Sequence, residues 1–446
     1  MTVQEPNLHV NEEERWRLPE CVTRIDRDGR VLFFNAQVPA WFVTNANGAL
    51  LLSLCDGVNT IDEIAVAYIQ TRGAAHADEV RRFFQMAWQS GIFQEGEEKP
   101  VKSVMQRLCQ VQLSISDTCN LHCRYCYATD RREGKHPLLT LTDYRHLIDD
   151  ILTISPHISF SLTGGEPLVN PDCIAIGTYI REQGCEVDLL TNATLISERN
   201  IEAVARTFCR VSVSIDGSTA PLHDMFRGRG AHERTMRAIH LLEEHGADYT
   251  LSMTVNRHNI NDVEAMAKKY GRRLTFQPLF PAGNAKKGDD ISITGREYYE
   301  ALRSAHGVNP LGYCESTLDE SRSAKRHKCA IGGAELSVSP TGDVYPCQLL
   351  HYPEFLLGNV HEQPLSELYR TSRVVRRCAG MTVDCIEGCR DCFLRYVCGG
   401  ACRARAYHEC GDIMTCGSFC EYEREAFIDG IFRIYSSNGI VAETMT

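Results

Sequence analysis

Three cysteines lie close together in one short stretch of the chain, at a C-x3-C-x2-C spacing. They are Cys119, Cys123 and Cys126. Three thiolates on one loop can hold three irons of a four-iron, four-sulfur cluster and leave the fourth iron open, where a small molecule can be bound and reduced. A structural zinc ion would need a fourth ligand from elsewhere in the chain. The spacing therefore favours an iron–sulfur site with an open iron, with zinc as the alternative.

A second group of chemically capable residues follows a predicted strand at residues 158–163. There Gly164 and Gly165 precede Glu166 and Pro167. Paired glycines let the backbone approach a ligand closely, and a carboxylate at this point can accept hydrogen bonds from an ammonium group. An ordinary turn between a strand and a helix is the alternative interpretation of this short motif.

The C-terminal part of the chain holds seven cysteines at regular spacings. Two follow the pattern C-x12-G-x4-C, four follow C-x2-C-x5-C-x3-C, and one comes after seventeen intervening residues; they are Cys329, Cys347, Cys389, Cys392, Cys398, Cys402 and Cys420. The whole chain has 21 cysteines. In a reducing compartment such density indicates metal or cluster ligation rather than disulfides. Because this region lacks strong periodicity, we expect it to fold around its metals.

Composition limits the partners and the compartment. The chain has 446 residues and a formal net charge of −11 at pH 7, which argues against nucleic acid as the main partner, because phosphate binding depends on Lys and Arg. No apolar run approaches the roughly 20 residues that cross a bilayer. The N-terminus has no basic segment followed by an apolar one. We therefore expect a cytoplasmic protein with neither a membrane nor a nucleic acid as partner.

The elements that would position the first cysteine loop alternate between strand and helix from residue 111 to residue 281. Strands are predicted at 111–116, 158–163, 187–191, 210–215, 249–255 and 273–278. Amphipathic helices lie between them, one of which we expect Thr142 to cap. This alternation implies parallel strands with right-handed crossovers. Six units are too few for an eight-fold barrel, so we predict an α/β fold with a partial (β/α)6 barrel. Its chemistry should lie at the carboxyl ends of the strands, where the Cys119 loop falls.

Together, the cysteine loop and the Gly-Gly-Glu-Pro turn resemble the radical SAM superfamily. The resemblance implies that Cys119, Cys123 and Cys126 hold a [4Fe–4S] cluster whose open iron binds S-adenosylmethionine. It also implies that the Gly-Gly-Glu-Pro motif holds the amino group of that cofactor. Further cofactor contacts implied by the resemblance are Tyr125 near the adenine, Asn192 in the pocket, Ser214 and Asp216 at the ribose, and Arg227 at the methionine carboxylate. Apart from Tyr125, each of these is a polar group at a strand end, so a satisfied turn residue is the alternative.

The seven C-terminal cysteines resemble the SPASM domain, whose family carries two auxiliary iron–sulfur clusters. The resemblance assigns the outer cluster to Cys389, Cys392, Cys398 and Cys420, and three ligands of the inner cluster to Cys329, Cys347 and Cys402. For the fourth inner ligand we predict Cys385, which is nearest to the ligand run, with Cys378, Cys314 or a substrate thiolate as alternatives. The chain would then hold three [4Fe–4S] clusters. We expect Cys410 and Cys416 to be spare thiols near the surface.

The N-terminal part predicts a small α+β unit. Residues 1 to about 17 are polar and acidic, and we expect them to be frayed; a hairpin with an Asp-Gly turn follows at 22–34. Three helices come next. We expect Asn45 or Asn47 to cap the first and Thr60 with Glu63 to cap the second, and the third to run from His76 to Ser90. Through its segment 47–65, the unit resembles the winged-helix-like PqqD-type RiPP recognition element, which binds the leader of a precursor peptide as an added strand. A small winged-helix or dimerisation module is the alternative.

These resemblances, in this order, imply an enzyme that modifies a ribosomally made peptide. We predict a recognition element at 1–97, a linker at 95–100, a radical SAM barrel at 104–305 and a SPASM domain at 306–446. A reductant such as flavodoxin or ferredoxin would feed the Cys119 cluster, and a 5′-deoxyadenosyl radical would take a hydrogen from the precursor peptide. We expect a thioether as the product, with a carbon–carbon or carbon–oxygen crosslink, epimerisation or another side-chain oxidation as alternatives. A non-enzymatic metal-stabilised scaffold or an electron carrier is the alternative of a different class.

Overall fold

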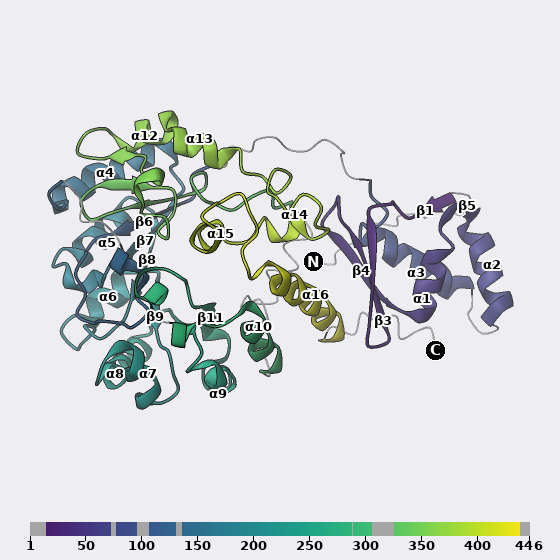
Figure 1. Ribbon diagram of the computed structural model, residues 1–446, viewed down its shortest axis with the longest axis horizontal. Coiled ribbons are helices and arrows are strands. Elements are labelled where there is room, and N and C mark those ends of the chain that lie inside the picture. The colour runs from purple at the N-terminus through teal and green to yellow at the C-terminus, as the bar shows by residue number, and fades with distance from the viewer. Residues whose placement is uncertain are drawn as a thin grey trace.

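The computed structural model describes residues 15–72, 77–95, 107–130, 136–287, 289–305 and 325–437. Within these ranges the chain forms an N-terminal α+β unit, a partial barrel and a cysteine-rich C-terminal region. In Figure 1 the barrel lies on the left and the N-terminal unit on the right, with α14 (Arg395–Cys398), α15 (Arg403–Cys410) and α16 (Cys420–Ser437) between them. The domain junctions predicted at 97–104 and 306 lie outside the described residues, so the domain limits stay predictions.

Six parallel strands form the barrel in chain order, each hydrogen-bonded to the next. They are β6 (Gln110–Ser114), β7 (Ser159–Thr163), β8 (Glu186–Thr191), β9 (Arg210–Ser214), β10 (Tyr249–Val255) and β11 (Leu274–Pro278). All six predicted strands are confirmed, and the partial (β/α)6 barrel with them. Their buried side chains form one hydrophobic core with the helices that cover the sheet.

Seven helices of the described ranges accompany these strands. They are α4 (Leu141–Ile154), α5 (Cys173–Glu182), α6 (Ile201–Thr207), α7 (Ala220–Arg227), α8 (Ala231–Glu244), α9 (Val263–Tyr270) and α10 (Gly295–Ser304). The predicted cap of α4 at Thr142 is wrong. Thr140 caps this helix instead, because Asp143 stands three residues further on and completes a capping box, whereas the residue three beyond Thr142 is Arg145, which has no acceptor.

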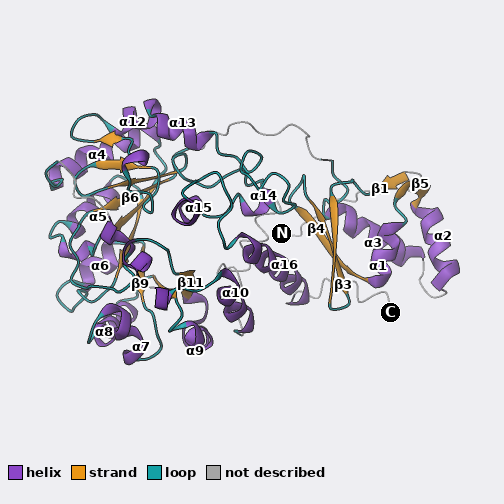
Figure 2. Ribbon diagram, viewed as in Figure 1, coloured by secondary structure: helices purple, strands orange, loops and turns teal. Residues whose placement is uncertain are grey.

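The C-terminal region continues the barrel sheet beyond β6. Strand β12 (Glu335–Val338) pairs parallel with β6, β13 (Asp343–Tyr345) pairs antiparallel with β12, and β14 (Gly358–Asn359) closes the row. Strands β12 and β13 form a hairpin before Cys347, with Gly342 at φ +85° in its turn. Helices α12 (Leu365–Thr371) and α13 (Arg373–Ala379) follow, and Figure 2 shows that loops make up most of the chain around α14 and α15.

The N-terminal unit contains more strands than the sequence predicted. Strand β1 (Arg15–Arg17) pairs with β5 (Asp56–Thr60), so the expected frayed start is wrong at this point. The physical reason is Trp16, which is buried against the aromatic rings of Phe84 and Phe93. The predicted hairpin is confirmed as β2 (Val22–Arg27) and β3 (Arg30–Asn35), to which β4 (Ala40–Asn45) adds a third strand.

Three helices pack on this sheet as predicted: α1 (Ala46–Ser53), α2 (Ile61–Arg72) and α3 (Ala77–Gln89). Asn45 caps α1, because its side-chain oxygen accepts from the Gly48 N–H at 2.9 Å. Thr60 and Glu63 form a capping box at α2.

Both faces of the sheet β2–β3–β4 are buried along β3 and β4. Because side chains alternate along a strand, Val31, Phe33 and Phe42 face α1, α2 and α3. The next residues along the strands, Leu32, Phe34, Trp41 and Val43, pack against apolar side chains of α14 and α16, among them Phe427, Ile428 and Ile431. The N-terminal unit is therefore docked on the C-terminal region through an apolar core of its own.

Ion pairs border this docking surface. The Arg27 guanidinium binds Asp429 and also donates to Glu425 Oε2 at 2.8 Å. The Tyr299 hydroxyl of α10 donates to the same Asp429 carboxylate. One carboxylate of α16 thus joins the N-terminal hairpin to the last helix of the barrel.

A search of the described residues for a helix long and apolar enough to span a bilayer finds none.

Candidate functional site

The loop with three cysteines leaves the carboxyl end of β6, as the barrel topology predicts. The thiols of Cys119, Cys123 and Cys126 lie close enough to influence one another electrostatically. Burial raises the pKa of the Cys123 thiol to about 11, and the nearby Arg227 opposes this rise. Such thiols stay protonated in the absence of a metal, and metal binding would release their protons to solvent as the thiolates form. The structure therefore brings the three predicted ligands together at the end of the barrel where chemistry is expected.

A segment after β11 holds this loop, and the sequence reasoning did not identify it. The Asn284 N–H donates to the Cys126 carbonyl at 3.0 Å, and its side-chain amide donates to the Cys123 carbonyl at 3.2 Å. A methyl group on Gly283, whose φ is +58°, would overlap the Cys126 carbonyl oxygen. The signal in the sequence is a Gly-Asn pair shortly after the last barrel strand.

The two glycines of the Gly-Gly-Glu-Pro turn lie against the backbone that enters the cysteine loop. The Gly165 N–H donates to the Ser116 carbonyl at 2.7 Å, and the Glu166 N–H donates to the Thr118 carbonyl at 3.0 Å. A methyl group on either glycine would overlap one of these two carbonyl oxygens. The close approach expected of paired glycines is thus made to the neighbouring strand end, and it locks the turn beside Cys119.

Glu166 points into the protein at this turn and is fully buried. Its carboxylate accepts hydrogen bonds from the Thr191 hydroxyl at 2.6 Å, from the Asn192 N–H at 2.8 Å and from the Leu168 N–H at 3.2 Å. Burial raises the pKa of the Glu166 carboxyl above its ordinary value, and the three hydrogen bonds partly offset this rise. Pro167 begins a short 3-10 turn directly after it.

Tyr125, Asp216 and Arg227 form a buried triad beside the cysteine loop. The Asp216 carboxylate accepts from the Tyr125 hydroxyl and from the Arg227 guanidinium, and Arg227 also donates to the Tyr125 oxygen at 2.7 Å. Asp216 and Arg227 are 0% and 8% exposed, so their opposite charges compensate each other inside the protein. The structure therefore places three of the predicted cofactor contacts together, with Asp216 and Arg227 bound to each other.

Two further predicted pocket residues lie at neighbouring strand ends. Asn192 follows β8, and its side-chain amide reaches the Cys119 sulfur at 3.8 Å and the Asn120 side-chain oxygen at 3.0 Å. Ser214 is the last residue of β9 and is half-buried. Asn192 thus touches the cysteine loop directly, whereas Ser214 stands one strand further along.

Four cysteines gather in a buried cluster behind the hairpin β12–β13. Cys329, Cys347 and Cys402, the predicted inner ligands, lie there together with Cys378. Cys385, the predicted fourth ligand, is exposed, and its sulfur accepts from the Thr382 hydroxyl at 3.5 Å. Cys314 lies outside the described residues. The structure thus brings Cys378, rather than Cys385, to the inner group.

The outer group contains all four predicted ligands and one additional thiol. The thiols lie close enough to influence one another electrostatically: Cys389 and Cys398, Cys398 and Cys420, and Cys420 and Cys392. The additional thiol is Cys416, whose sulfur lies 3.7 Å from that of Cys389. Cys410, by contrast, is exposed.

Single metal ions and four-iron clusters need different spacings between their thiolate ligands. No three His, Cys, Asp or Glu side chains in the described ranges come together closely enough to hold one metal ion. A zinc ion about 2.3 Å from each sulfur would hold its thiolates roughly 3.8 Å apart. A four-iron cluster binds each thiolate at a different iron, so its ligands are gathered but more widely spaced.

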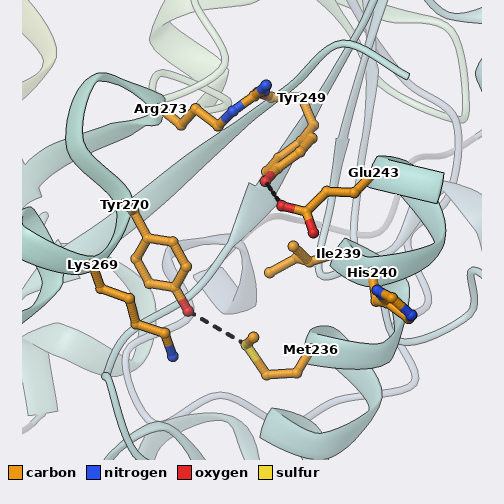
Figure 3. A pocket seen from close by; sticks show the side chains of 8 residues that line it. All are labelled: Met236, Ile239, His240, Glu243, Tyr249, Lys269, Tyr270 and Arg273. Atoms are coloured by element: carbon orange, nitrogen blue, oxygen red, sulfur yellow. Dashed lines mark hydrogen bonds between the residues drawn. The ribbon is translucent and has the colours of Figure 1, made fainter. Parts of the chain in front are cut away.

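A pocket of about 480 Å³ lies away from the cysteines, among Glu243, Tyr249, Lys269 and Arg273 (Figure 3). Tyr249 begins β10 and Arg273 precedes β11, so this pocket is at the amino ends of the strands. The Tyr249 hydroxyl donates to Glu243 inside it. Because the chemistry of such barrels lies at the carboxyl ends, we assign it no part in the site.

Two family models match the chain. The radical SAM superfamily matches residues 113–270, which span the barrel from β6 to α9. An iron–sulfur cluster-binding domain, SPASM, matches residues 329–393, which contain Cys329, Cys347 and Cys378 of the inner group and the first two cysteines of the outer group.

Individual relatives differ in what they act on. The chain is 31% identical over 334 residues to the AdoMet-dependent heme synthase of Methanosarcina barkeri, which covers 68% of this chain and 93% of the relative. It is 27% identical over 273 residues to the mycofactocin maturase MftC of Mycobacterium ulcerans, which covers 55% of this chain and 70% of the relative. The crystal structure of Streptococcus suis SuiB bound to precursor peptide SuiA has a TM-score of 0.56 at 14% identity, and the match covers 91% of this chain and 99% of that one.

Proposed function

This chain belongs to the radical SAM superfamily and carries a SPASM iron–sulfur domain, and we propose that it forms a thioether crosslink in a ribosomally made precursor peptide. Its cofactors are S-adenosylmethionine and iron–sulfur clusters. The thioether would join a cysteine sulfur to a carbon of another residue of the peptide.

The proposal of a peptide substrate rests on the N-terminal α+β unit and on its docking against the C-terminal region. Its sheet packs on α14 and α16 through Leu32, Phe34 and Trp41, and Arg27 binds Asp429 of α16. A peptide held by this unit would therefore stay next to the region that carries the outer cysteines. Two of the relatives support this substrate class, since one is a maturase and the other is seen bound to its precursor peptide.

The residues around the Cys119 loop suit the cofactor pair. Cys119, Cys123 and Cys126 would hold a cluster with one open iron, and bound S-adenosylmethionine would supply radical hydrogen abstraction there. The locked Gly-Gly-Glu-Pro turn would orient the amino group of the cofactor beside that iron. The buried triad of Tyr125, Asp216 and Arg227 would form the wall of the pocket, excluding water and keeping its charges fixed.

We further propose two auxiliary clusters, which would bring the total to three. Cys389, Cys392, Cys398 and Cys420 would hold the outer one. Cys329, Cys347 and Cys402 would hold the inner one, with Cys378 as the fourth ligand that the packing favours over Cys385. These clusters would accept the electron left on the peptide after hydrogen abstraction, and an external reductant such as flavodoxin or ferredoxin would supply the first one.

The leader of the precursor would add as a strand to the open edge of β2. This strand and β4 are the two edges of the sheet, but Ala40 to Thr44 of β4 are all buried, whereas β2 is half-buried or exposed. Counted from the two-residue turn, the antiparallel alternation directs the backbone of Arg24 away from β3. An added strand would therefore pair with the backbone of Arg24.

Binding of the peptide's leader to two variants of the full chain tests this step. Arg24→Pro removes one backbone donor from the open edge, where proline is tolerated. It should weaken leader binding about fivefold, since one hydrogen bond is worth about 1 kcal/mol. Arg24→Ala keeps the donor and removes only the exposed ion pair with Asp26, so it should bind like the wild type. Equal binding by all three proteins would refute the edge of β2 as the leader site.

The reaction itself is tested by mass spectrometry of the precursor peptide after co-expression. A crosslink removes two hydrogens, whereas epimerisation leaves the mass unchanged. Alkylation of the product then separates the crosslinks, because a thioether consumes a thiol and a carbon–carbon or carbon–oxygen bond does not. A peptide that loses two hydrogens but still alkylates at every cysteine would refute the thioether.

A second candidate function is modification of a haem-type tetrapyrrole, which the 31% identity to a heme synthase favours. That alignment covers 68% of this chain, however, and a small-molecule substrate gives no role to the docked N-terminal unit. Incubation of the reduced enzyme with S-adenosylmethionine and iron-coproporphyrin distinguishes the two. Turnover of the porphyrin without any peptide would replace the proposal.

A further inference from the structure

The outer group of cysteines contains one thiol more than a four-iron cluster needs. The Cys416 sulfur lies 3.7 Å from the Cys389 sulfur and also contacts the Cys420 thiol. Cys389 and Cys420 are both assigned to the outer auxiliary cluster, in which each of four irons takes one thiolate. With Cys392 and Cys398, five sulfurs compete for four positions.

The loop that carries Cys416 is folded over the turn that carries Cys389. The Glu387 N–H donates to the Met414 carbonyl at 3.1 Å, and the Cys416 thiol donates to the Glu387 carbonyl at 3.2 Å. The first bond joins backbone groups of the two loops, and the second joins the Cys416 side chain to the backbone of the Cys389 turn. The sulfur–sulfur approach is therefore built into the fold of the two loops.

Two neighbouring residues keep the sulfur at this place. Gly388 has φ +77°, and a methyl group on it would lie 2.9 Å from the Cys416 sulfur, so the glycine leaves the space that the thiol occupies. On the other side, the buried Arg403 guanidinium donates to the Thr415 carbonyl at 2.7 Å, immediately before Cys416. The Cys410 thiol, by contrast, is exposed and contacts the Cys416 carbonyl oxygen at 3.9 Å.

We propose that Cys416 is a fifth ligand of the outer auxiliary cluster, interchangeable with Cys389 and Cys420. This inference rests on the auxiliary clusters of the proposed function. When the bond between iron and Cys389 breaks, the Cys416 thiol loses its proton to solvent and its thiolate bonds to the same iron, while the released Cys389 thiolate takes up a proton. No electron is transferred. A thiol tethered this close acts at an effective concentration of at least the millimolar range, so it outcompetes free thiols in solution.

The test is the iron content and Mössbauer spectrum of the full chain, purified without oxygen. Cys389→Ser alone should keep the wild-type iron content, because Cys416 takes the vacant iron. The double variant Cys389→Ser/Cys416→Ser should lose about four irons per chain. Cys392→Ser removes a ligand that is not one of the two thiols Cys416 contacts, and it should lose about four irons by itself. The matched control is Cys389→Ser/Cys410→Ser, which should keep its iron.

Three outcomes would overturn the inference. One is equal iron loss in Cys389→Ser and Cys392→Ser, and another is full iron content in the double variant with Cys416→Ser. If Cys389→Ser does not fold, Cys420→Ser replaces it with the same expectation, and iron loss there counts equally against Cys416. Failure of the proposed function looks different, because a wild-type chain with only the irons of the Cys119 cluster would refute both auxiliary clusters at once.

Discussion

Truncation of Ile431 on α16 should release the N-terminal unit from the C-terminal region. Ile431 is 0% exposed and belongs to the hydrophobic core that Leu32, Phe34, Trp41 and Val43 of the sheet share with α14 and α16. This core exists only while the two parts are docked. Truncation of Ile431 should therefore lower the free energy of docking and leave the internal core of the N-terminal unit intact.

The size of the effect follows from the burial. Ile431→Ala removes three buried carbon groups, each worth about 0.8 kcal/mol in transfer from water. The transfer term is thus about 2.4 kcal/mol, and the cavity left behind brings the expected total to about 2–5 kcal/mol. At about 1.4 kcal/mol for each factor of ten, the undocked fraction should rise at least roughly thirtyfold.

The assay is the fluorescence of Trp41, which is 1% exposed at the docking surface, in a Trp16→Phe/Trp88→Phe background. In a urea titration the free energy of the Trp41 transition should fall by about 2–5 kcal/mol in Ile431→Ala. Ile180→Ala is the matched control, since Ile180 is also 0% exposed but packs only in the barrel core. It should lower the stability of the barrel and leave the Trp41 transition in place. A change of less than about 0.5 kcal/mol in Ile431→Ala would refute the docking.

Three further predictions concern the site. Gly165→Ala should prevent the Cys119 cluster from loading, because its methyl group would overlap the Thr118 backbone. Iron analysis measures the loading. The control is Gly246→Ala, whose added methyl group would have no atom within 4 Å. Asp216→Asn should lower the free energy of unfolding by about 3–5 kcal/mol, because it leaves the Arg227 charge buried and unpaired. The control is Asp248→Asn in the exposed pair with Arg210, which should cost less than about 1 kcal/mol in the same denaturation experiment. Burial lowers the pKa of His223 to about 4, so the unfolded state binds a proton that the folded state does not between pH 6.5 and 4. Stability should therefore fall by about 2 kcal/mol from pH 7 to pH 5 through this group, and His223→Gln should remove that part of the pH dependence; an unchanged pH profile would contradict the assignment.

Features that depend on local pattern were predictable from the sequence. The six barrel strands, the capping box at Thr60 and Glu63, and the Asp28-Gly29 hairpin each rest on residues close together in the chain. The cap of α4 was missed for a local reason, since two threonines stand near its start and only Thr140 has an acidic residue three positions on.

Features that depend on distant pairing were not predictable in the same way. Strand β1 forms because Arg15 pairs with Thr60 and Trp16 is buried. The polar sequence around Trp16 indicates neither contact. The cofactor contacts were located by motif, but the bond between Asp216, Arg227 and Tyr125 joins residues about a hundred positions apart. The contact of Cys416 with Cys389 likewise depends on how two loops fold over each other.

The C-terminal region contacts the partial barrel at both ends of its row of six strands. At one end β12 pairs with β6, the strand that leads into the Cys119 loop. At the other end the buried Arg405 guanidinium of α15 donates to the carbonyls of Pro278 and Leu279, where β11 ends. Six strands cannot close a barrel by themselves, so the gap between β6 and β11 is where this region attaches.

The same attachment fixes the cysteine groups relative to one another. Cys347 follows the hairpin that β12 begins, and Cys402 caps the helix that carries Arg405. The inner group is thus connected to the first barrel strand through Cys347 and to the last through Cys402. Tyr127, next to Cys126, even donates to the side chain of Gln348, next to Cys347, at 3.5 Å. Under the proposed function, a peptide that enters between the Cys119 loop and the inner group would meet both proposed clusters. Their separation would then be fixed by the one continuous sheet that carries β6 and β12.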